Sequence, residues 1–201
     1  KNGLYFTRAW SAQNHGAGGS LVALYKLQFA ASAFSAQEIV KEVSISSNWI
    51  LTDVDGNLAF QQAGLLPKRK NSGLYPLDAR NSDNLWEEIL SSDSLISYKN
   101  PAENYIVSAN NDMSEEGKPV SVNLSMGPYR YDRIKELLES QNDFNLDDMK
   151  FIQTDLLSLQ AKKFGHIFEE VLGPKERGPI TDLLKNWDYR YIKYSKEATV
   201  F

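Results

Sequence analysis

A strand–turn–strand pattern in the first third of the chain is the feature that most restricts its fold. Residues 48–54 and 57–62 are both rich in apolar and β-forming side chains, and Asp55 and Gly56 separate them. An Asp-Gly pair between two such runs favours a tight hairpin turn in which both central residues take positive φ. A third strand is predicted at residues 105–109. The chain is therefore expected to contain antiparallel strands.

Apolar residues recur at helical spacing before and after this hairpin, and this spacing predicts helices on both sides of it. One helix is expected to start at Ser20 and a second at the capping-box pattern of residues 35–38, ending near Val43. The side of the first helix expected to be buried comprises Leu21, Leu24, Tyr25, Leu27, Ala31 and Phe34. Later helices are expected from residue 131 to 140, from a cap at Asn145 to about Leu172, and after Pro179.

The order of these elements predicts an α+β fold, with antiparallel strands flanked by helices. Residues 64–104 are rich in Gly, Pro, Asn and Ser, and we expect a long ordered loop that packs over a site. We treat residues 1–201 as a single segment. Its first part, residues 1–128, holds a helix, the hairpin, the loop and a strand, and residues 129–201 are mostly helical.

Composition excludes several classes of function. The 201 residues include no Cys, which rules out disulfides, a thiolate nucleophile and cysteine-ligated metal sites. A formal net charge of −4 argues against nucleic acid as a main partner, because binding phosphates requires a basic face. No apolar run approaches the roughly 18–20 residues that a membrane-spanning helix needs, so no membrane partner is expected.

Two local patterns invite a metal or a hydrolase interpretation. Asp53, Asp55 and Asn57 have the oxygen ligands that calcium prefers, but their glycine stands fourth rather than sixth, and the hairpin turn explains all three residues. Residues 123–127 resemble a nucleophile elbow that lacks its first Gly. His166, which such a hydrolase would need as its base, falls on the face of a long predicted helix. We favour neither interpretation.

Asn110 and Arg133 are the remaining candidates, and each has two interpretations. Asn110 precedes a second Asn at the end of the predicted strand, where it could form an Asx turn or donate to a developing oxyanion. Arg133 lies near the start of a predicted helix, where its charge opposes the helix dipole. Either Asp132 compensates this charge or Arg133 serves a site. The residues alone leave both questions open.

Three segments, taken in order, resemble the penicillin acylase (penicillin amidase) family of N-terminal-nucleophile hydrolases. They read SNWILTDVDGNLAFQQAGLLPKR (47–69), NPAENYIVSANN (100–111) and YRYDRIKELL (129–138). The family pattern has Asn-Trp, Asp-x-x-Gly-Asn-Ile, Asn-Pro, Ala-Asn-Asn and Arg-x-x-Arg-Ile in this order. The resemblance extends over nearly the whole chain through TRAW (7–10), DDMKFIQTD (147–155) and WDYRYIKYSKEATVF (187–201).

This resemblance implies a fold, a mechanism and two site residues. The fold would be part of the αββα sandwich of an Ntn hydrolase, and this chain would be an internal segment of the large chain. Family members cut their own precursor, and the Ser that then begins the large chain attacks a linear amide with its α-amino group as general base. By this resemblance Asn110 helps to hold the oxyanion and Arg133 supports the active site. Lys1 cannot be the nucleophile, so we expect the chain alone to be inactive.

The implied partners are the remaining segments of the same precursor and an acyl-amide small molecule. No cofactor is expected, because the calcium ligands of some relatives have no convincing counterpart here. The isolated segment would expose sheet edges and apolar side chains, so it could self-associate. Relatives are often exported, which makes a periplasmic or extracellular location a family-level expectation. A non-catalytic scaffold or binding module that keeps the family fold is the alternative.

Overall fold

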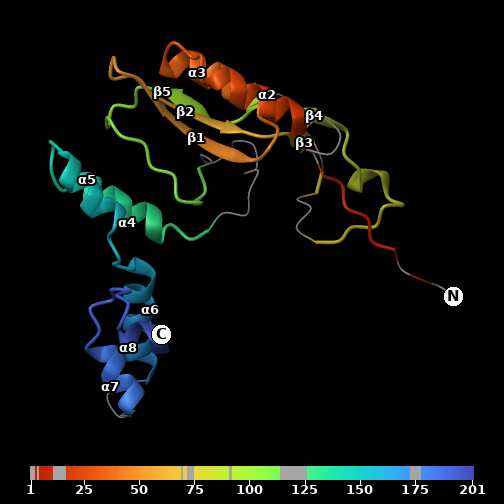
Figure 1. The fold of residues 1–201 in the computed structure, drawn as a ribbon. Helices are drawn as coiled ribbons and strands as arrows, with labels where there is room; N and C mark the ends of the chain where they lie inside the picture. Colours follow the sequence, from red (N-terminus) through yellow and green to blue (C-terminus); the bar gives the residue numbers. More distant parts are fainter. Residues whose placement is uncertain are drawn as a thin grey trace. The chain divides into compact units, whose positions relative to one another are not determined.

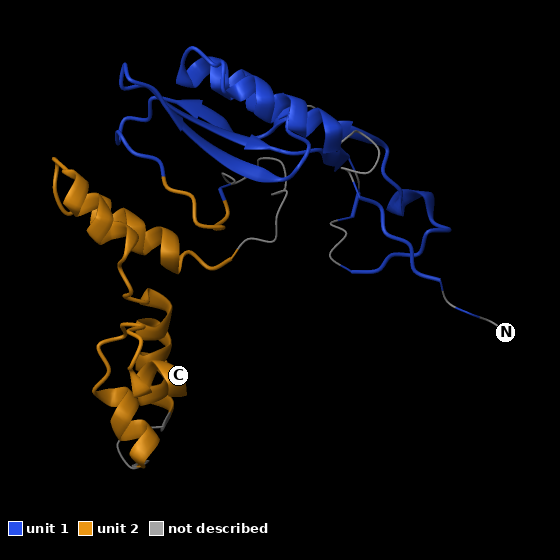
Figure 2. Ribbon diagram, viewed as in Figure 1, with its two compact units in different colours: residues 1–106, 113–124 blue, residues 107–112, 125–201 orange. Residues whose placement is uncertain are grey.

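A computed structural model describes residues 3, 5–10, 17–68, 70–71, 75–90, 92–113, 126–172 and 178–201. The chain divides into two compact units, which Figure 2 colours separately. Unit 1 comprises residues 1–106 and 113–124, and unit 2 comprises residues 107–112 and 125–201. Residues 107–112 therefore group with the C-terminal helices and not with the sheet that precedes them in sequence.

The hairpin predicted from sequence forms the centre of unit 1. Strand β1 (Ser47–Thr52) pairs antiparallel with β2 (Leu58–Ala63), with Ser47 opposite Ala63 and Thr52 opposite Leu58. On its other side β2 pairs antiparallel with β5 (Ser97–Lys99), which gives the order β1-β2-β5. A second, two-stranded sheet joins β3 (Leu66–Lys68) to β4 (Glu88–Leu90).

Two predictions are wrong: residues 105–109 do not form a strand, and residues 64–104 are not one long loop. That stretch supplies β3, β4 and β5, with two 3₁₀ turns at Ser82–Asn84 and Ser92–Ser94. β5 takes the edge of the sheet because Tyr98 stacks on Phe60 of β2 at 4.9 Å. Residues 105–109 instead lie between Asn104 and Asn110, which both have positive φ, a conformation that ends an extended strand.

The turn of the hairpin differs from the prediction in one respect. Gly56 has φ +82°, but Asp55 is not among the residues with positive φ. Gly56 N donates to Asp53 O, and Asp53 N donates to Asn57 O, so the loop is longer than a two-residue turn. The Asp53 carboxylate accepts hydrogen bonds from the backbone N–H groups of Ala33, Asp55 and Asn57 and from the Asn57 amide. These bonds lower the pKa of Asp53 and tie the turn to a helix.

Two helices, α2 (Ala17–Leu27) and α3 (Ala33–Val40), cover one face of the three-stranded sheet (Figure 1). Between helices and sheet lies a core of Ala23, Val40, Val43 and Ala63, against which Leu27, Ile39, Trp49 and Leu51 pack. Helix α3 begins three residues earlier than the predicted capping box. Its cap is Ser32, and Ser35 is the residue that returns the hydrogen bond to the cap.

Within α2, the predicted buried side is correct only at Leu27, which packs against the core. α2 ends at Leu27, and its buried residues are Ser20 and Ala23. Leu21 and Tyr25 are 69% and 66% exposed. Ser20 Oγ accepts a hydrogen bond from Ser44 N at 2.9 Å and lies 2.7 Å from Ser44 Oγ. The side of α2 that carries the small residues Ser20 and Ala23 faces the core, because small side chains let the helix backbone come close to the segment at Ser44.

Unit 2 consists mainly of helices: α4 (Tyr129–Leu138), α5 (Leu146–Gln153), α6 (Leu159–Leu172), α7 (Pro179–Lys185) and α8 (Lys196–Val200). The predicted cap at Asn145 is confirmed, because its side chain accepts from the N–H groups of Asp147 and Asp148. In the part of the chain that the structure describes, no helix has the length and apolar character to span a membrane.

The continuous helix predicted from residue 146 to about 172 is wrong, because the chain leaves the helix at residues 154–158. Tertiary contacts explain the interruption. Tyr191 N donates to Leu156 O, and Ser158 N donates to Tyr189 O, so this stretch pairs with a distant segment. Thr154 closes α5 by donating its hydroxyl to Lys150 O at 2.9 Å. The chain restarts as α6 at Leu159.

Candidate functional site

Asn110 lies in the middle of a bend formed by residues 109–111. Its φ of 61° lies in the left-handed region, which Asn adopts more readily than most residues. Its carbonyl oxygen accepts a hydrogen bond from Met126 N at 2.7 Å. The neighbouring Asn111 uses its own side chain locally, accepting from Ala109 N at 3.0 Å. The local turn role therefore falls to Asn111, and the Asn110 side chain points to a different partner.

That partner is Arg130, in the first turn of α4. Its Nη2 donates to the Ala109 carbonyl at 2.8 Å and to Asn110 Oδ1 at 2.6 Å. A guanidinium group has only donors, so it must take the oxygen end of the Asn110 amide. The amide nitrogen, Nδ2, is thereby the end that can donate to another molecule. The sequence analysis missed Arg130, although the Arg-x-x-Arg pattern contained it.

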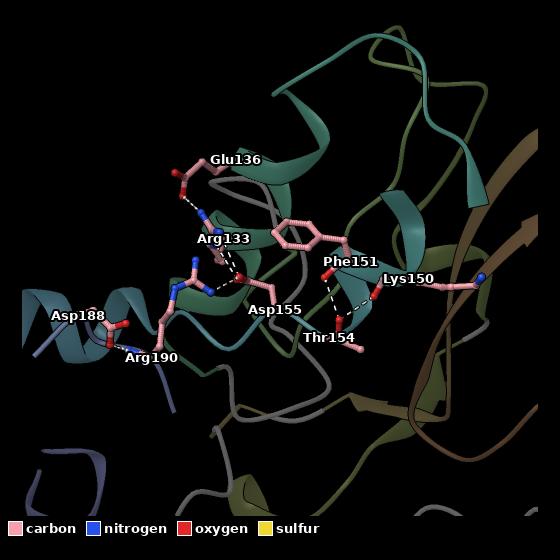
Figure 3. Close-up of polar contacts among 8 residues, drawn as sticks. All are labelled: Arg133, Glu136, Lys150, Phe151, Thr154, Asp155, Asp188 and Arg190. Atoms are coloured by element: carbon pink, nitrogen blue, oxygen red, sulfur yellow. Dashed lines mark hydrogen bonds and ion pairs between the residues drawn. The ribbon is translucent and has the colours of Figure 1, made fainter. Parts of the chain in front are cut away.

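Arg133 lies one turn further along α4, and its partner is Asp155. Nε and Nη2 of Arg133 donate to the two carboxylate oxygens at 2.7 and 3.2 Å, as Figure 3 shows. Nη1 lies 3.0 Å from Glu136 Oε2. The side chains of Arg133 and Asp155 are only 14% and 4% exposed. The carboxylates that compensate Arg133 are therefore Asp155 and Glu136, where the sequence had suggested Asp132.

A second arginine completes the surroundings of Asp155. Arg190 Nη1 donates to Asp155 Oδ1 at 3.3 Å (Figure 3). Arg190 is itself held in place, because its N–H donates to Asp188 Oδ1 and its carbonyl oxygen accepts from Trp187 Nε1. We name Arg133, Asp155 and Arg190 the Asp155 cluster. It joins α4, the end of α5 and the segment that precedes α8.

The Asp155 cluster favours the ionised carboxylate. Hydrogen bonding from Arg133 is the largest influence and lowers the pKa of Asp155, the positive charge of Arg190 acts in the same direction, and burial opposes both. The pKa of Asp155 in the folded protein is therefore below the value of about 4 that it has in an unfolded chain.

Acidification is expected to destabilise unit 2 through this group. Because the folded-state pKa is depressed, the stability contributed by Asp155 is fully present above about pH 4 and is lost as pH falls through the folded pKa. Hydrogen exchange of the α4 and α5 amides at stepped pH should show this loss. In the variant Asp155→Asn, the protection of the same amides against exchange should fall less between about pH 5 and about pH 2 than it does in the parent protein. An equal change in both proteins would contradict the assignment.

The other residues considered from sequence lie apart from these contacts. Residues 123–125, which contain the Ser of the elbow-like pattern, lie outside the described residues. The His166 side chain is 58% exposed on α6, with Nδ1 3.8 Å from Glu169 and its ring 6.0 Å from that of Tyr189. Among the described residues there is no group of three or more His, Asp or Glu side chains that could hold a metal ion.

Comparisons with known proteins agree with the pattern seen in the sequence. The family model described as penicillin amidase matches residues 3–201. Among solved structures, the chain is similar to thermostable penicillin G acylase from Alcaligenes faecalis, with a TM-score of 0.67 and 19% sequence identity. The match covers 90% of this chain and 34% of that one, so the chain spans about a third of the length of that relative. No curated protein matches the chain.

Proposed function

The chain belongs to the penicillin amidase family, and from this membership we propose that it is part of an amidohydrolase that cleaves linear amides. The nucleophile would be the N-terminal Ser of the large chain, which lies outside these residues. This chain would contribute Asn110 to the oxyanion hole. The observation that carries the proposal is the contact of Arg130 with Asn110 Oδ1, since it leaves Nδ2 as the donor.

The mechanism follows from the placement of this donor. The Ser hydroxyl attacks the amide carbonyl carbon while its own α-amino group takes the proton. The carbonyl oxygen becomes an oxyanion, which accepts hydrogen bonds from Asn110 Nδ2 and from a backbone N–H. As this intermediate collapses, the α-ammonium group returns its proton to the leaving nitrogen, so that the free amine departs and an acyl-enzyme remains. Water then hydrolyses the acyl-enzyme to the acid and the free Ser hydroxyl. The Arg130 charge beside Oδ1 polarises the amide of Asn110 and strengthens its N–H donor.

Arg133 would support this site without touching it. The carboxylates of Asp155 and Glu136 hold the Arg133 side chain. Arg130, three residues earlier, makes the contact with Asn110. Residues three apart on a helix are neighbours on its surface, so fixing one restricts where the other can reach. The role that the family resemblance assigns to an arginine is thus divided between Arg130 at the site and Arg133 behind it.

The proposed partners are an acyl-amide small molecule and the remaining segments of the same precursor. The exposed apolar side chains of α2, among them Leu21, Val22 and Tyr25, support contact with other polypeptide. The same surface gives the isolated chain a route to self-association. We propose no cofactor for the reaction, because the acyl-enzyme route uses only protein groups and water.

Activity of the separated pieces tests the proposal. The full-length protein should hydrolyse a chromogenic acyl anilide, and its mature large chain should begin with Ser when its N-terminus is sequenced. The 201-residue chain alone should show no turnover above background. Turnover by this chain alone would contradict the assignment of the nucleophile. A folded full-length protein that is inactive on a panel of acyl amides would favour the alternative of a non-catalytic scaffold.

A further inference from the structure

Helix α4 carries two arginines whose partners lie on different parts of unit 2. Arg130 donates to Asn110, and Arg133 donates to Asp155 through two bonds. A guanidinium–carboxylate pair with two parallel bonds fixes orientation as well as distance. The position of α4, and with it the reach of Arg130, therefore depends on where Asp155 is held.

The backbone next to Asp155 is bonded to the backbone next to Arg190, although the two residues are far apart in the sequence. Two residues after Asp155, Leu157 forms an isolated antiparallel bridge with Arg190. Tyr191 N donates to Leu156 O, and Ser158 N donates to Tyr189 O, so the two strands of this bridge are bonded in register. The carboxylate thus extends from a stretch of backbone that is hydrogen-bonded to residues 189–191.

The backbone at Tyr189 indicates that this segment serves a purpose besides chain connection. Tyr189 has φ 61°, a conformation that a bulky side chain rarely adopts. Its ring is held against Trp187 at 5.5 Å between centroids, and a Cβ on Gly165 would lie 2.7 Å from it. Strained residues of this kind persist where the surrounding structure imposes them, often near functional sites. Arg190, the next residue, lies 3.3 Å from Asp155.

We propose that Asp155 is a positioning residue for the oxyanion site, which acts by holding Arg133 and so aligning α4 for the contact of Arg130 with Asn110. The inference rests on the proposed function. A buried ion pair is a poor source of net stability but can select one arrangement of the elements it joins. At 4% exposure Asp155 cannot contact a substrate itself, so any effect on turnover must act through its partners.

Steady-state kinetics of the full-length protein tests this with the variants Asp155→Asn, Asn110→Ala and the double variant. Asp155→Asn should lower kcat by about 10- to 100-fold and change KM by less than about 2-fold, because a misplaced oxyanion donor weakens mainly the transition state. In the Asn110→Ala background the same substitution should lower kcat by less than about 3-fold. Rates are divided by the concentration of active sites from the acyl-enzyme burst, which removes the effect of misfolded protein.

A matched control is Asp147→Asn, which removes a carboxylate from the exposed face of α5 and should leave kcat unchanged. If Asp155→Asn does not accumulate as folded protein, Arg190→Gln replaces it, since the Arg190 side chain is 39% exposed. This variant should give a smaller loss that again disappears in the Asn110→Ala background.

The outcomes separate this inference from the proposed function. If Asn110→Ala leaves kcat unchanged, the oxyanion role proposed for Asn110 and this inference are both wrong, while the proposed amidohydrolase activity stands. If Asn110→Ala lowers kcat but the loss from Asp155→Asn is equal in both backgrounds, Asp155 acts on stability alone and only this inference is wrong. A loss of kcat in Asp155→Asn that disappears in the Asn110→Ala background supports it.

Discussion

Replacement of Asn110 by Ala is expected to lower kcat of the full-length enzyme by about 10²- to 10³-fold, the cost of one oxyanion-hole donor. Arg130 Nη2 donates to Asn110 Oδ1 at 2.6 Å, which leaves Nδ2 as the end of the amide that would donate to the proposed oxyanion. KM should change much less, because the developing charge exists only in the transition state. Single-turnover measurement of acyl-enzyme formation with a chromogenic acyl amide provides the rate.

Two further variants make the interpretation of this loss specific. Asn110→Asp keeps an oxygen for Arg130 but has no N–H, so it should lose activity as severely as Asn110→Ala. Asn142→Ala removes an exposed Asn from the same unit and should stay within about 2-fold of the parent kcat. If Asn110→Ala and Asn142→Ala retained the same kcat, Asn110 would not be the oxyanion donor.

Replacement of Arg133 by Met is expected to destabilise unit 2 by about 3 kcal/mol, because it leaves the Asp155 carboxylate buried without its main partner. The value is near the lower end for broken buried pairs, since Arg190 still lies 3.3 Å from Asp155. Native-state hydrogen exchange of α4 and α5 amides measures this change locally, which avoids assuming that the whole protein unfolds in one step.

The matched control is Lys150→Met, which also removes a cation paired with an aspartate. Lys150 and Asp147 are 72% and 88% exposed, so the substitution should change the stability of α5 by less than about 0.5 kcal/mol. Equal protection factors in Arg133→Met and Lys150→Met would show that burial of the Asp155 cluster has no energetic consequence. A large difference in the expected direction would locate the stabilisation at that cluster.

The parts of the fold that were predicted correctly are those with local causes. The hairpin follows from two β-forming runs around Asp55-Gly56, and the start of α5 follows from the Asn145 cap. Both depend on residues that lie close together in the sequence. The prediction of the third strand was wrong for the opposite reason. Ser97–Lys99 pairs with β2, and Tyr98 stacks on Phe60, but no local pattern at residues 97–99 predicts this pairing.

The candidate site shows the same division. Asn110 and Arg133 were assigned from the sequence, through the order of the family motifs. Which arginine contacts Asn110 could not be assigned in this way, because Arg130 and Arg133 are three residues apart and are both plausible on a helix of unknown orientation. The choice is made by Asp155, which takes Arg133 and leaves Arg130 for Asn110.

By itself the sequence determined the family, the hairpin and the cap of α5, since these rest on residue types and short spacings. The tertiary structure alone decided which polar side chains pair: Arg130 with Asn110 across 20 residues and Arg133 with Asp155 across 22. It also decided that α2 buries Ser20 and Ala23. Pairing and burial depend on which surfaces pack against each other, and that is a property of the folded chain as a whole.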